Sequence, residues 1–231
     1  MLGLALLVPL VLTGCGAAKT ATANAAERTT GDVRATIMFV GDSNIERALT
    51  QIGIVLTDRA YAYQLVDVAR AGTGIRTYDC VGNLSRCRTG EYWKSRLAEA
   101  LQHTTPDGFV VDLGINDTLS PGTATTPGYA AYGQKIDWLM RLLPTTKPVW
   151  WTNLPCTIEP ANRAPGCAAV NDALAAAPHR WRNLTVLDWA RIADHHPRYL
   201  RASLRHIHFS DEGALVWSRL VGRALDARFP A

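Results

Sequence analysis

Four short segments of the chain carry polar residues of the kinds used in acyl-transfer chemistry. They are Gly41-Asp42-Ser43-Asn44, Ala71-Gly72-Thr73-Gly74, Gly114-Ile115-Asn116-Asp117 and His206-Ile207-His208-Phe209-Ser210. Together they offer a hydroxyl, a glycine backbone, a carboxamide and an imidazole. Acyl transfer needs a nucleophile within hydrogen-bond reach of a base, and N–H donors directed at the oxygen that becomes negative. The four segments can supply these groups if the fold brings them together.

The elements that must position these segments are an alternating series of strands and helices. Short apolar runs predict strands at 35–40, 62–69, 109–113, 148–153 and 184–187. Helical patterns predict helices at 45–57, 91–102, 129–143, 168–177 and 211–228, the last with Ser210 as its N-cap. Such alternation builds βαβ units and a parallel sheet covered on both faces. The sequence therefore predicts an α/β fold, a three-layer α/β/α sandwich with a five-stranded, flavodoxin-like parallel sheet.

The order of the four segments resembles that of the SGNH hydrolases, the superfamily that includes the GDSL esterases and lipases. In a parallel α/β sheet the ligand binds beyond the carboxyl ends of the strands, and the first three segments lie there. The resemblance extends from Phe39 to about Gly213. The matched residues are Ser43 in the first family block, Gly74 in the second with Gly72 as the alternative, Asn116 in the third and His208 in the last.

The resemblance implies a role for each matched residue. Ser43 would attack the carbonyl carbon of an ester, and His208 would take the hydroxyl proton and return it to the leaving alcohol. The backbone N–H groups of Ser43 and Gly74, together with the side-chain amide of Asn116, would form the oxyanion hole. Loss of one such donor typically costs about 2.7 to 4 kcal/mol of transition-state stabilisation.

Several of these residues also have a purely structural interpretation. Ser43 precedes a helical stretch and could be its N-cap. Asp42 and Asp117 are expected to hold loop backbone rather than to act on substrate. His206 is the alternative to His208, but the family's H-x-S spacing favours His208.

Three features depart from the family pattern, and the first is that the usual asparagine of the second block is missing. Asn44 replaces the usual leucine, and Arg205 stands where the family places an aspartate that orients the histidine. An arginine cannot accept the Nδ1–H bond of the imidazole. Three outcomes are open: a backbone carbonyl orients His208, another acid reaches it, or the protein has lost much of its activity. The candidate acids are Asp211, Asp194 and Asp188.

The first 32 residues are predicted to lie outside the folded domain. Residues 1–12 form an apolar run that is too short to span a bilayer and typical of a signal-peptide core. The run ends in Leu-Thr-Gly-Cys, which resembles a bacterial lipobox with Cys15 as the lipidation site. A plain secretory signal cleaved between residues 17 and 26 is the alternative. We therefore assign 1–15 to a lipoprotein-like signal peptide, 16–32 to a flexible tether and 33–231 to the hydrolase domain.

The remaining cysteines form two local pairs, Cys80 with Cys87 and Cys156 with Cys167. An even count at short spacing in an exported chain favours disulfides. The chain has no C-x-x-C pair, so the cysteines do not indicate a zinc site, and we expect no metal and no cofactor.

Composition restricts the class of protein. The 231 residues are 48% hydrophobic and 19% charged, which suits one globular domain and excludes disordered, collagen-like and coiled-coil chains. Lys and Arg number 24 against 20 Asp and Glu, a net charge of +4. Because the arginines are scattered, we expect no nucleic-acid partner.

The expected function is that of a serine esterase at the cell envelope, secreted or lipid-anchored to the outer face of the membrane. We expect a monomer that acts on a small acyl ester or an acylated glycan and that meets the membrane only through its lipid anchor. An acyltransferase would use the same residues, and a catalytically weakened glycan-binding protein is a further alternative. Trp150, Trp151 and Trp189 could contact a sugar or an acyl chain, although such residues are more often core.

Overall fold

The computed structural model describes residues 33–58, 62–75, 92–118, 129–156, 164–204 and 206–230. The predicted signal peptide, the tether, Cys80, Cys87 and Arg205 lie outside these ranges.

The described part of the chain contains a five-stranded sheet in the order β2-β1-β3-β4-β5. Every pair of neighbouring strands is parallel. This is the flavodoxin-like order, and it confirms the predicted fold class. The strands are β1 (Ala35–Gly41), β2 (Tyr63–Asp67), β3 (Gly108–Asp112), β4 (Val149–Thr152) and β5 (Leu184–Leu187).

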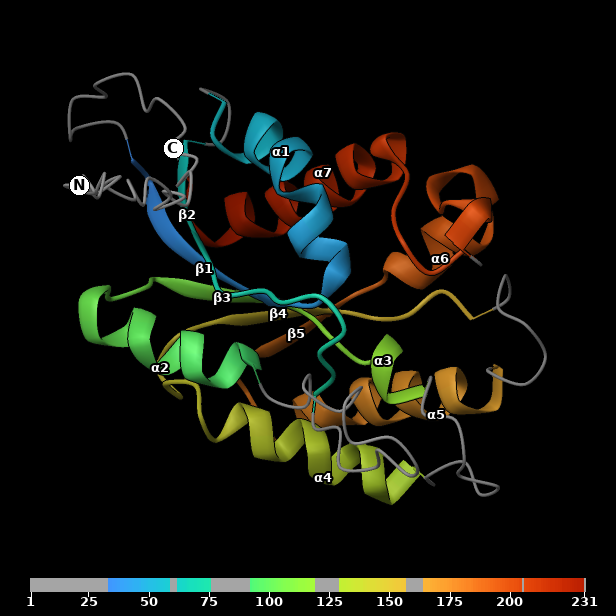
Figure 1. Ribbon diagram of the computed structural model, residues 1–231. Coiled ribbons are helices and arrows are strands. Elements are labelled where there is room, and N and C mark those ends of the chain that lie inside the picture. The colour runs from blue at the N-terminus through green and yellow to red at the C-terminus, as the bar shows by residue number, and fades with distance from the viewer. Residues whose placement is uncertain are drawn as a thin grey trace, which may run out of the picture. The chain divides into compact units, whose positions relative to one another are not determined.

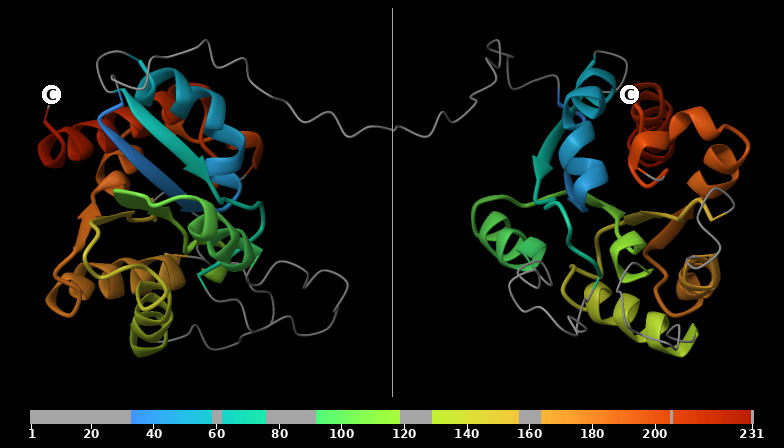
Figure 2. Two further views of the ribbon diagram at one scale, coloured as in Figure 1. Left: turned by 90° about the vertical axis from the view of Figure 1, so that its left-hand side faces the viewer. Right: turned by 45° about the vertical axis from the view of Figure 1, so that its right-hand side comes forward.

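Helices cover both faces of the sheet (Figure 1). Helices α1, α6 and α7 lie on one face, whereas α2, α4 and α5 lie on the other, and the further views in Figure 2 show the same three layers. None of the described helices is long and apolar enough to cross a membrane. The helices are α1 (Ser43–Leu56), α2 (Tyr92–His103), α3 (Ile115–Thr118), α4 (Tyr129–Met140), α5 (Ala164–Ala176), α6 (Trp189–Asp194) and α7 (Asp211–Arg228), with 3₁₀ turns at Ala177–His179, Pro197–Tyr199 and Ala202–Leu204.

The helix boundaries follow local capping and length. The last helix begins at Asp211 because the Ser210 hydroxyl accepts a hydrogen bond from the Gly213 N–H at 3.0 Å, as predicted. The first helix begins at Ser43, two residues before the predicted start, because Asp42 caps it. Helices α3 and α6 were not predicted, since four and six residues are too few to show a helical period.

The sheet separates two apolar clusters. One contains residues of β3, α2, α4 and α5, and the other contains residues of β1, α1, α6 and α7. Trp151 belongs to the first cluster, while Trp150 and Trp189 belong to the second. All three are at most 4% exposed, which agrees with a core role rather than with a sugar-binding surface.

Candidate active site

The turn between β1 and α1 places Ser43 at the first position of a helix. Asp42 is the N-cap, and its Oδ1 accepts a hydrogen bond from the Asn44 N–H at 2.8 Å. The capping interpretation of Ser43 is therefore wrong, because Asp42 has that role and leaves the serine hydroxyl available for another contact. Gly41 precedes them, and a Cβ at this position would overlap the side chain of Ile45.

The hydroxyl of Ser43 meets the imidazole of His208. Ser43 Oγ and His208 Nε2 are 2.9 Å apart, although 165 positions separate the two residues in the chain. His208 lies in the loop before α7, and this loop is attached to an earlier segment through a bridge between Leu200 and Phe209. The alternative residue, His206, has a positive φ of 56° and lines a small pocket beside the site. The structure thus brings His208, and not His206, to the serine.

The surroundings of His208 favour its neutral form. Burial lowers the pKa of the imidazole below its usual 6.5, and the positive charges of Arg47 and Arg201 lower it further. A neutral imidazole can accept a proton from the Ser43 hydroxyl. The electrostatic environment therefore suits a general base near neutral pH.

The second nitrogen of the imidazole, Nδ1, has no hydrogen-bond partner among the described residues. His208 Nδ1 is buried, and none of the described residues forms a hydrogen bond with it. The Asp211 carboxylate accepts a bond from Arg201 Nη2 at 2.9 Å. Asp188 accepts from Asn153 Nδ2 at 2.9 Å and caps α6. In the described part of the chain, neither an acid nor a backbone carbonyl orients His208 through Nδ1.

Asn116 joins three of the predicted segments. Its Nδ2 donates to Asp42 Oδ2 at 3.0 Å and to the Thr73 carbonyl oxygen at 2.8 Å. These bonds connect the loops that follow β1, β2 and β3. A carboxamide nitrogen carries two protons, so both are engaged here. Donation from Asn116 to an oxyanion would require one of these bonds to be exchanged.

Three hydrogen bonds fix the backbone around Gly74. The preceding Thr73 carbonyl accepts from Asn116, and the Gly74 carbonyl accepts from the buried indole N–H of Trp93 at 2.9 Å. The following N–H, of Ile75, donates to Asp117 Oδ2 at 2.7 Å. Asp117 therefore holds loop backbone, as predicted. Gly72 has a φ of 75° and forms the turn that precedes this segment, which explains a glycine there.

Two buried carboxyl groups lie beneath the site. Burial and the neighbouring charge of Asp112 raise the pKa of Asp42 well above its usual range. Burial also raises the pKa of Asp112 to about 6, although its Oδ1 accepts a bond from Thr152 Oγ1 at 2.6 Å. Asp112 did not emerge from the sequence analysis. The available signal was a carboxylate at the end of a wholly apolar strand, which is rare unless the group has a specific partner or role.

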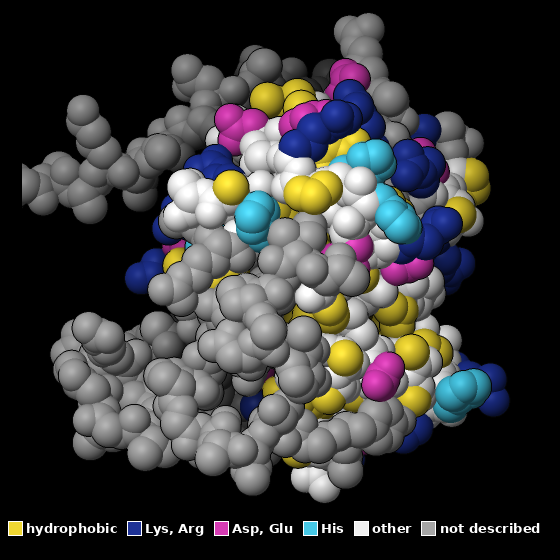
Figure 3. All heavy atoms as spheres, turned by 90° about the vertical axis from the view of Figure 1, so that its right-hand side faces the viewer, with side chains coloured by type: hydrophobic (Ala, Val, Ile, Leu, Met, Phe, Trp, Pro, Cys, Tyr) yellow, Lys and Arg dark blue, Asp and Glu magenta, His cyan; other side chains and the backbone are white. Residues whose placement is uncertain are grey.

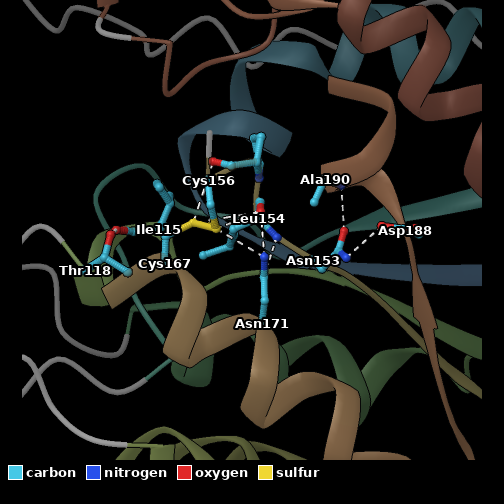
Figure 4. Close-up of a disulfide and its surroundings, with 10 residues drawn as sticks. Ile115, Thr118, Asn153, Leu154, Cys156, Cys167, Asn171, Asp188 and Ala190 are labelled. Carbon is cyan, nitrogen blue, oxygen red and sulfur yellow. Dashed lines mark hydrogen bonds between the residues drawn. A yellow bond between two sulfur atoms is a disulfide. The ribbon is translucent and has the colours of Figure 1, made fainter. Parts of the chain in front are cut away.

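The disulfide between Cys156 and Cys167 confirms one predicted pair. Its Cα atoms are 5.6 Å apart. Figure 4 shows that it lies beside Asn171 of α5, whose side chain forms two bonds with the backbone of Leu154. Leu154 and Asn153 come directly after β4, so the disulfide supports a loop at the carboxyl end of the sheet. The predicted pair Cys80–Cys87 lies outside the described residues.

A small pocket opens between this loop and the loop of His208. Its lining includes Asn44, Ile115 and Phe209, which are the sequence neighbours of Ser43, Asn116 and His208. The remaining lining residues are Asp112, Asn153, Leu154, Pro155, Trp189, Leu200, His206 and Ile207. On this side of the molecule, Figure 3 shows Lys and Arg side chains interspersed with Asp, Glu and His. In the described part of the chain, no three His, Cys, Asp or Glu side chains are grouped as metal ligands.

Solved structures with the same fold include several acyl-processing proteins. A lipase/acylhydrolase from Enterococcus faecalis is 16% identical, with a TM-score of 0.63 over 84% of this chain and 96% of that one. A putative acylhydrolase from Bacteroides fragilis is 14% identical, with a TM-score of 0.61 over 84% and 88%. The C-terminal catalytic domain of peptidoglycan O-acetyltransferase A from Streptococcus pneumoniae, with a methylsulfonyl adduct, is 18% identical, with a TM-score of 0.57 over 83% and 93%. At these identities the likeness shows the fold alone.

No curated protein matches the chain at a significant level. The model of the GDSL-like lipase/acylhydrolase family, in contrast, matches residues 39–216, which is most of the chain. The matched range begins in β1 and ends in α7, so it includes Ser43, Gly74, Asn116 and His208. The chain therefore belongs to the GDSL-like lipase/acylhydrolase family.

Proposed function

We propose that the protein is a serine ester hydrolase in which Ser43 is the nucleophile and His208 the general base. The contact of 2.9 Å between Ser43 Oγ and His208 Nε2 carries this proposal. Membership of an acylhydrolase family supports it, as does the lowered pKa of His208.

The proposed reaction follows from these contacts. Nε2 of the neutral His208 takes the proton of the Ser43 hydroxyl while Oγ attacks the carbonyl carbon of the ester. His208 then returns this proton to the leaving alcohol, which departs and leaves an acyl group on Ser43. A water molecule, activated by His208 in the same way, releases the acid and restores the free serine.

The oxyanion of each tetrahedral intermediate needs fixed donors. We assign this role to the backbone N–H groups of Ser43 and Gly74 and to the side chain of Asn116. Support comes from the first turn of α1, which has its positive end at Ser43, and from the three bonds that fix the backbone around Gly74. The two backbone donors are fixed in advance and require no reorganisation as the negative charge develops, whereas Asn116 must exchange one of its two hydrogen bonds in order to donate.

We further propose that the protein is exported and acts on acyl esters at the cell envelope, either short-chain, lipid or glycan-bound. The disulfide Cys156–Cys167 supports an oxidising compartment. The apolar run that ends at Cys15 supports a lipid anchor. Incorporation of a labelled fatty acid, present in the unaltered protein and absent from Cys15→Ser, would test the anchor.

Transfer of the acyl group to a hydroxyl acceptor is the second candidate activity. The structural likeness to the catalytic domain of a peptidoglycan O-acetyltransferase favours it. Both activities pass through the same acyl-serine and differ only in the acceptor. Product analysis separates them, because hydrolysis releases free acid whether or not a glycan is present, whereas transfer places the acyl group on the added glycan.

Hydrolysis of p-nitrophenyl acetate tests the proposed function. Ser43→Ala should abolish hydrolysis and change the thermal midpoint little. Ser218→Ala is the matched control. The Ser218 hydroxyl is buried in α7, lies away from the site and donates a hydrogen bond of 2.7 Å to the Ala214 carbonyl. Full activity in a folded Ser43→Ala protein would overturn the proposal. An inactive unaltered protein that still binds acylated glycan would favour the catalytically weakened alternative.

A further inference from the structure

Two side chains from opposite ends of the domain sequence bond the backbone of the residue that follows the proposed base. Asn44 lies next to Ser43, whereas Arg201 lies in the segment before the loop of His208. Each of them forms a hydrogen bond with Phe209, the residue that follows His208. The residue after the base is therefore held at both its N–H and its carbonyl oxygen.

Asn44 links the start of α1 to the loop of His208. Its side chain is buried, with only 8% of the residue exposed, and its Oδ1 accepts a bond from the Phe209 N–H at 3.2 Å. The backbone N–H of Asn44 is fixed in turn by Asp42 Oδ1. The helix turn that carries Ser43 is thus tied to the residue directly after His208.

Arg201 holds the same loop by three contacts. Its backbone N–H donates to the His208 carbonyl at 2.8 Å, and its Nε donates to the Phe209 carbonyl at 2.9 Å. Its Nη2 reaches Asp211 Oδ1 at 2.9 Å, at the start of α7. The guanidinium group is a planar fork, so it fixes the distance between the loop and the helix.

We propose that Asn44 and Arg201 are positioning residues that hold His208 against Ser43 by clamping the backbone of His208 and Phe209. With the backbone fixed, only the two side-chain torsions of His208 remain to direct Nε2 to the serine. None of the described residues forms a hydrogen bond with Nδ1 of the ring. Among the described contacts, the hydrogen bonds to the backbone of His208 and Phe209 therefore restrain the position of the base. This proposal rests on the proposed function, because the clamp matters for catalysis only if His208 is the base.

Asn44→Leu is the first test, because it keeps the size of a buried side chain and removes the acceptor for the Phe209 N–H. We expect kcat on p-nitrophenyl acetate to fall about tenfold, with KM within about twofold of the unaltered value. Asn183→Leu is the matched control. Asn183 makes a similar bond, from Nδ2 to the Lys147 carbonyl at 2.8 Å, but at the amino end of β5 and away from the site. We expect Asn183→Leu to keep the unaltered kcat.

Arg201 is tested with two variants that separate its charge from its geometry. Arg201→Met removes both the charge and the side-chain donors, so kcat should fall and the apparent pKa of the His208 limb should rise. Arg201→Lys keeps the charge but replaces the fork with one flexible ammonium group. We expect it to keep the unaltered pH profile and to recover only part of kcat.

Resonances of the His208 ring give a readout that needs no turnover. In Asn44→Leu we expect the ring resonances to broaden or shift and their titration to move up toward the ordinary histidine pKa. In Asn183→Leu they should be unchanged. If Asn44→Leu and Arg201→Lys both keep kcat, and the His208 resonances stay as they are, the clamp is overturned. If the unaltered protein does not hydrolyse the ester, the proposed function fails, and the ring resonances alone then decide about the clamp.

Discussion

Asp117 Oδ2 accepts a hydrogen bond from the Ile75 N–H at 2.7 Å, so the residue after Asn116 fixes the loop that carries Gly74. The other oxygen of the carboxylate, Oδ1, is 2.9 Å from Lys135 Nζ, and the side chain of Asp117 is fully buried. One carboxylate therefore ties α4 and the loop after β3 to the loop after β2. The position of the proposed oxyanion donor at Gly74 depends on this arrangement.

Asp117→Ala should reduce both activity and stability. It leaves the Ile75 N–H without its acceptor and Lys135 without its counter-ion, and breaking a buried pair in this way costs about 3 to 5 kcal/mol. We expect kcat to fall by about 10²-fold as Gly74 loses its alignment. Lys135→Met is the control, because it removes the charge contact and keeps the acceptor for Ile75. An Asp117→Ala protein that unfolds at the unaltered midpoint and keeps full kcat would contradict this role.

The sequence was sufficient to predict the fold, because each strand is a short apolar run and each site segment follows a strand or precedes the last helix. It was also sufficient to pair Ser43 with His208 through the order of the family blocks. The bonds of Asn116 could not be predicted. They depend on Asp42 and on the Thr73 carbonyl, and only the tertiary packing of three loops brings these groups to one side chain.

The contact between Asn44 and Phe209 could not be predicted either, because it also depends on tertiary packing. The sequence shows Asn44 as a departure from the family pattern, but its partner lies 165 positions away. Asp112 was overlooked because a single carboxylate within an apolar run carries no periodic signal. The family aspartate that orients the histidine through Nδ1 corresponds to Arg205 in this chain. Arg205 lies outside the described residues.

The pH dependence of hydrolysis should report the environment of His208. The base must be neutral, so kcat/KM should rise with pH along a limb whose midpoint lies below 6.5, and then reach a plateau. Arg47→Gln removes one of the positive charges that lower this pKa, so the midpoint should move to higher pH. Because Arg47 is exposed, high salt should reduce the difference between the two proteins.

Arg219→Gln is the control for this measurement, since Arg219 is an exposed arginine of α7 that does not contribute to the lowered pKa of His208. It should leave the limb in place. A limb that is centred above 6.5, or that does not move in Arg47→Gln, would show that His208 does not control the rate.

Stability should depend on the protonation of Asp112. Its pKa rises from 3.8 to about 6 on folding, so the folded state binds this proton more tightly than the unfolded state. The stabilisation is complete below about pH 4 and is lost as pH rises through about 6. Asp112→Asn should therefore become more stable relative to the unaltered protein over this range, by about 1 to 3 kcal/mol. Urea denaturation at pH 4, 5, 6 and 7 measures the difference.

The exposed carboxylate of Asp172 in α5 supplies the comparison for this experiment. Asp172→Asn removes one carboxylate that is not buried, so it controls for the loss of a single charge. If the difference for Asp112→Asn is the same at all four pH values, the proton on Asp112 does not contribute to folding.

The two cysteine pairs can be tested separately. Non-reducing peptide mapping should find Cys156 linked to Cys167, and it should find Cys80 linked to Cys87, a pair that remains a prediction. Replacing Cys156 and Cys167 by alanine should lower the free energy of unfolding by about 2 to 3 kcal/mol, the value expected for a loop of this length. Free thiols at Cys80 and Cys87, or a bridge between the two loops, would show that the predicted pairing is wrong.

The most direct measurement of the central claim is the reaction of Ser43 with phenylmethylsulfonyl fluoride, followed by intact mass and peptide mapping. If His208 removes the Ser43 proton, Oγ forms a bond to sulfur, fluoride leaves, and the added mass is found on Ser43 alone. In His208→Ala the modification should be at least about 10²-fold slower, because the general base is missing. Modification of Ser43 at the same rate in both proteins, or no modification of Ser43 in the unaltered protein, would contradict the account.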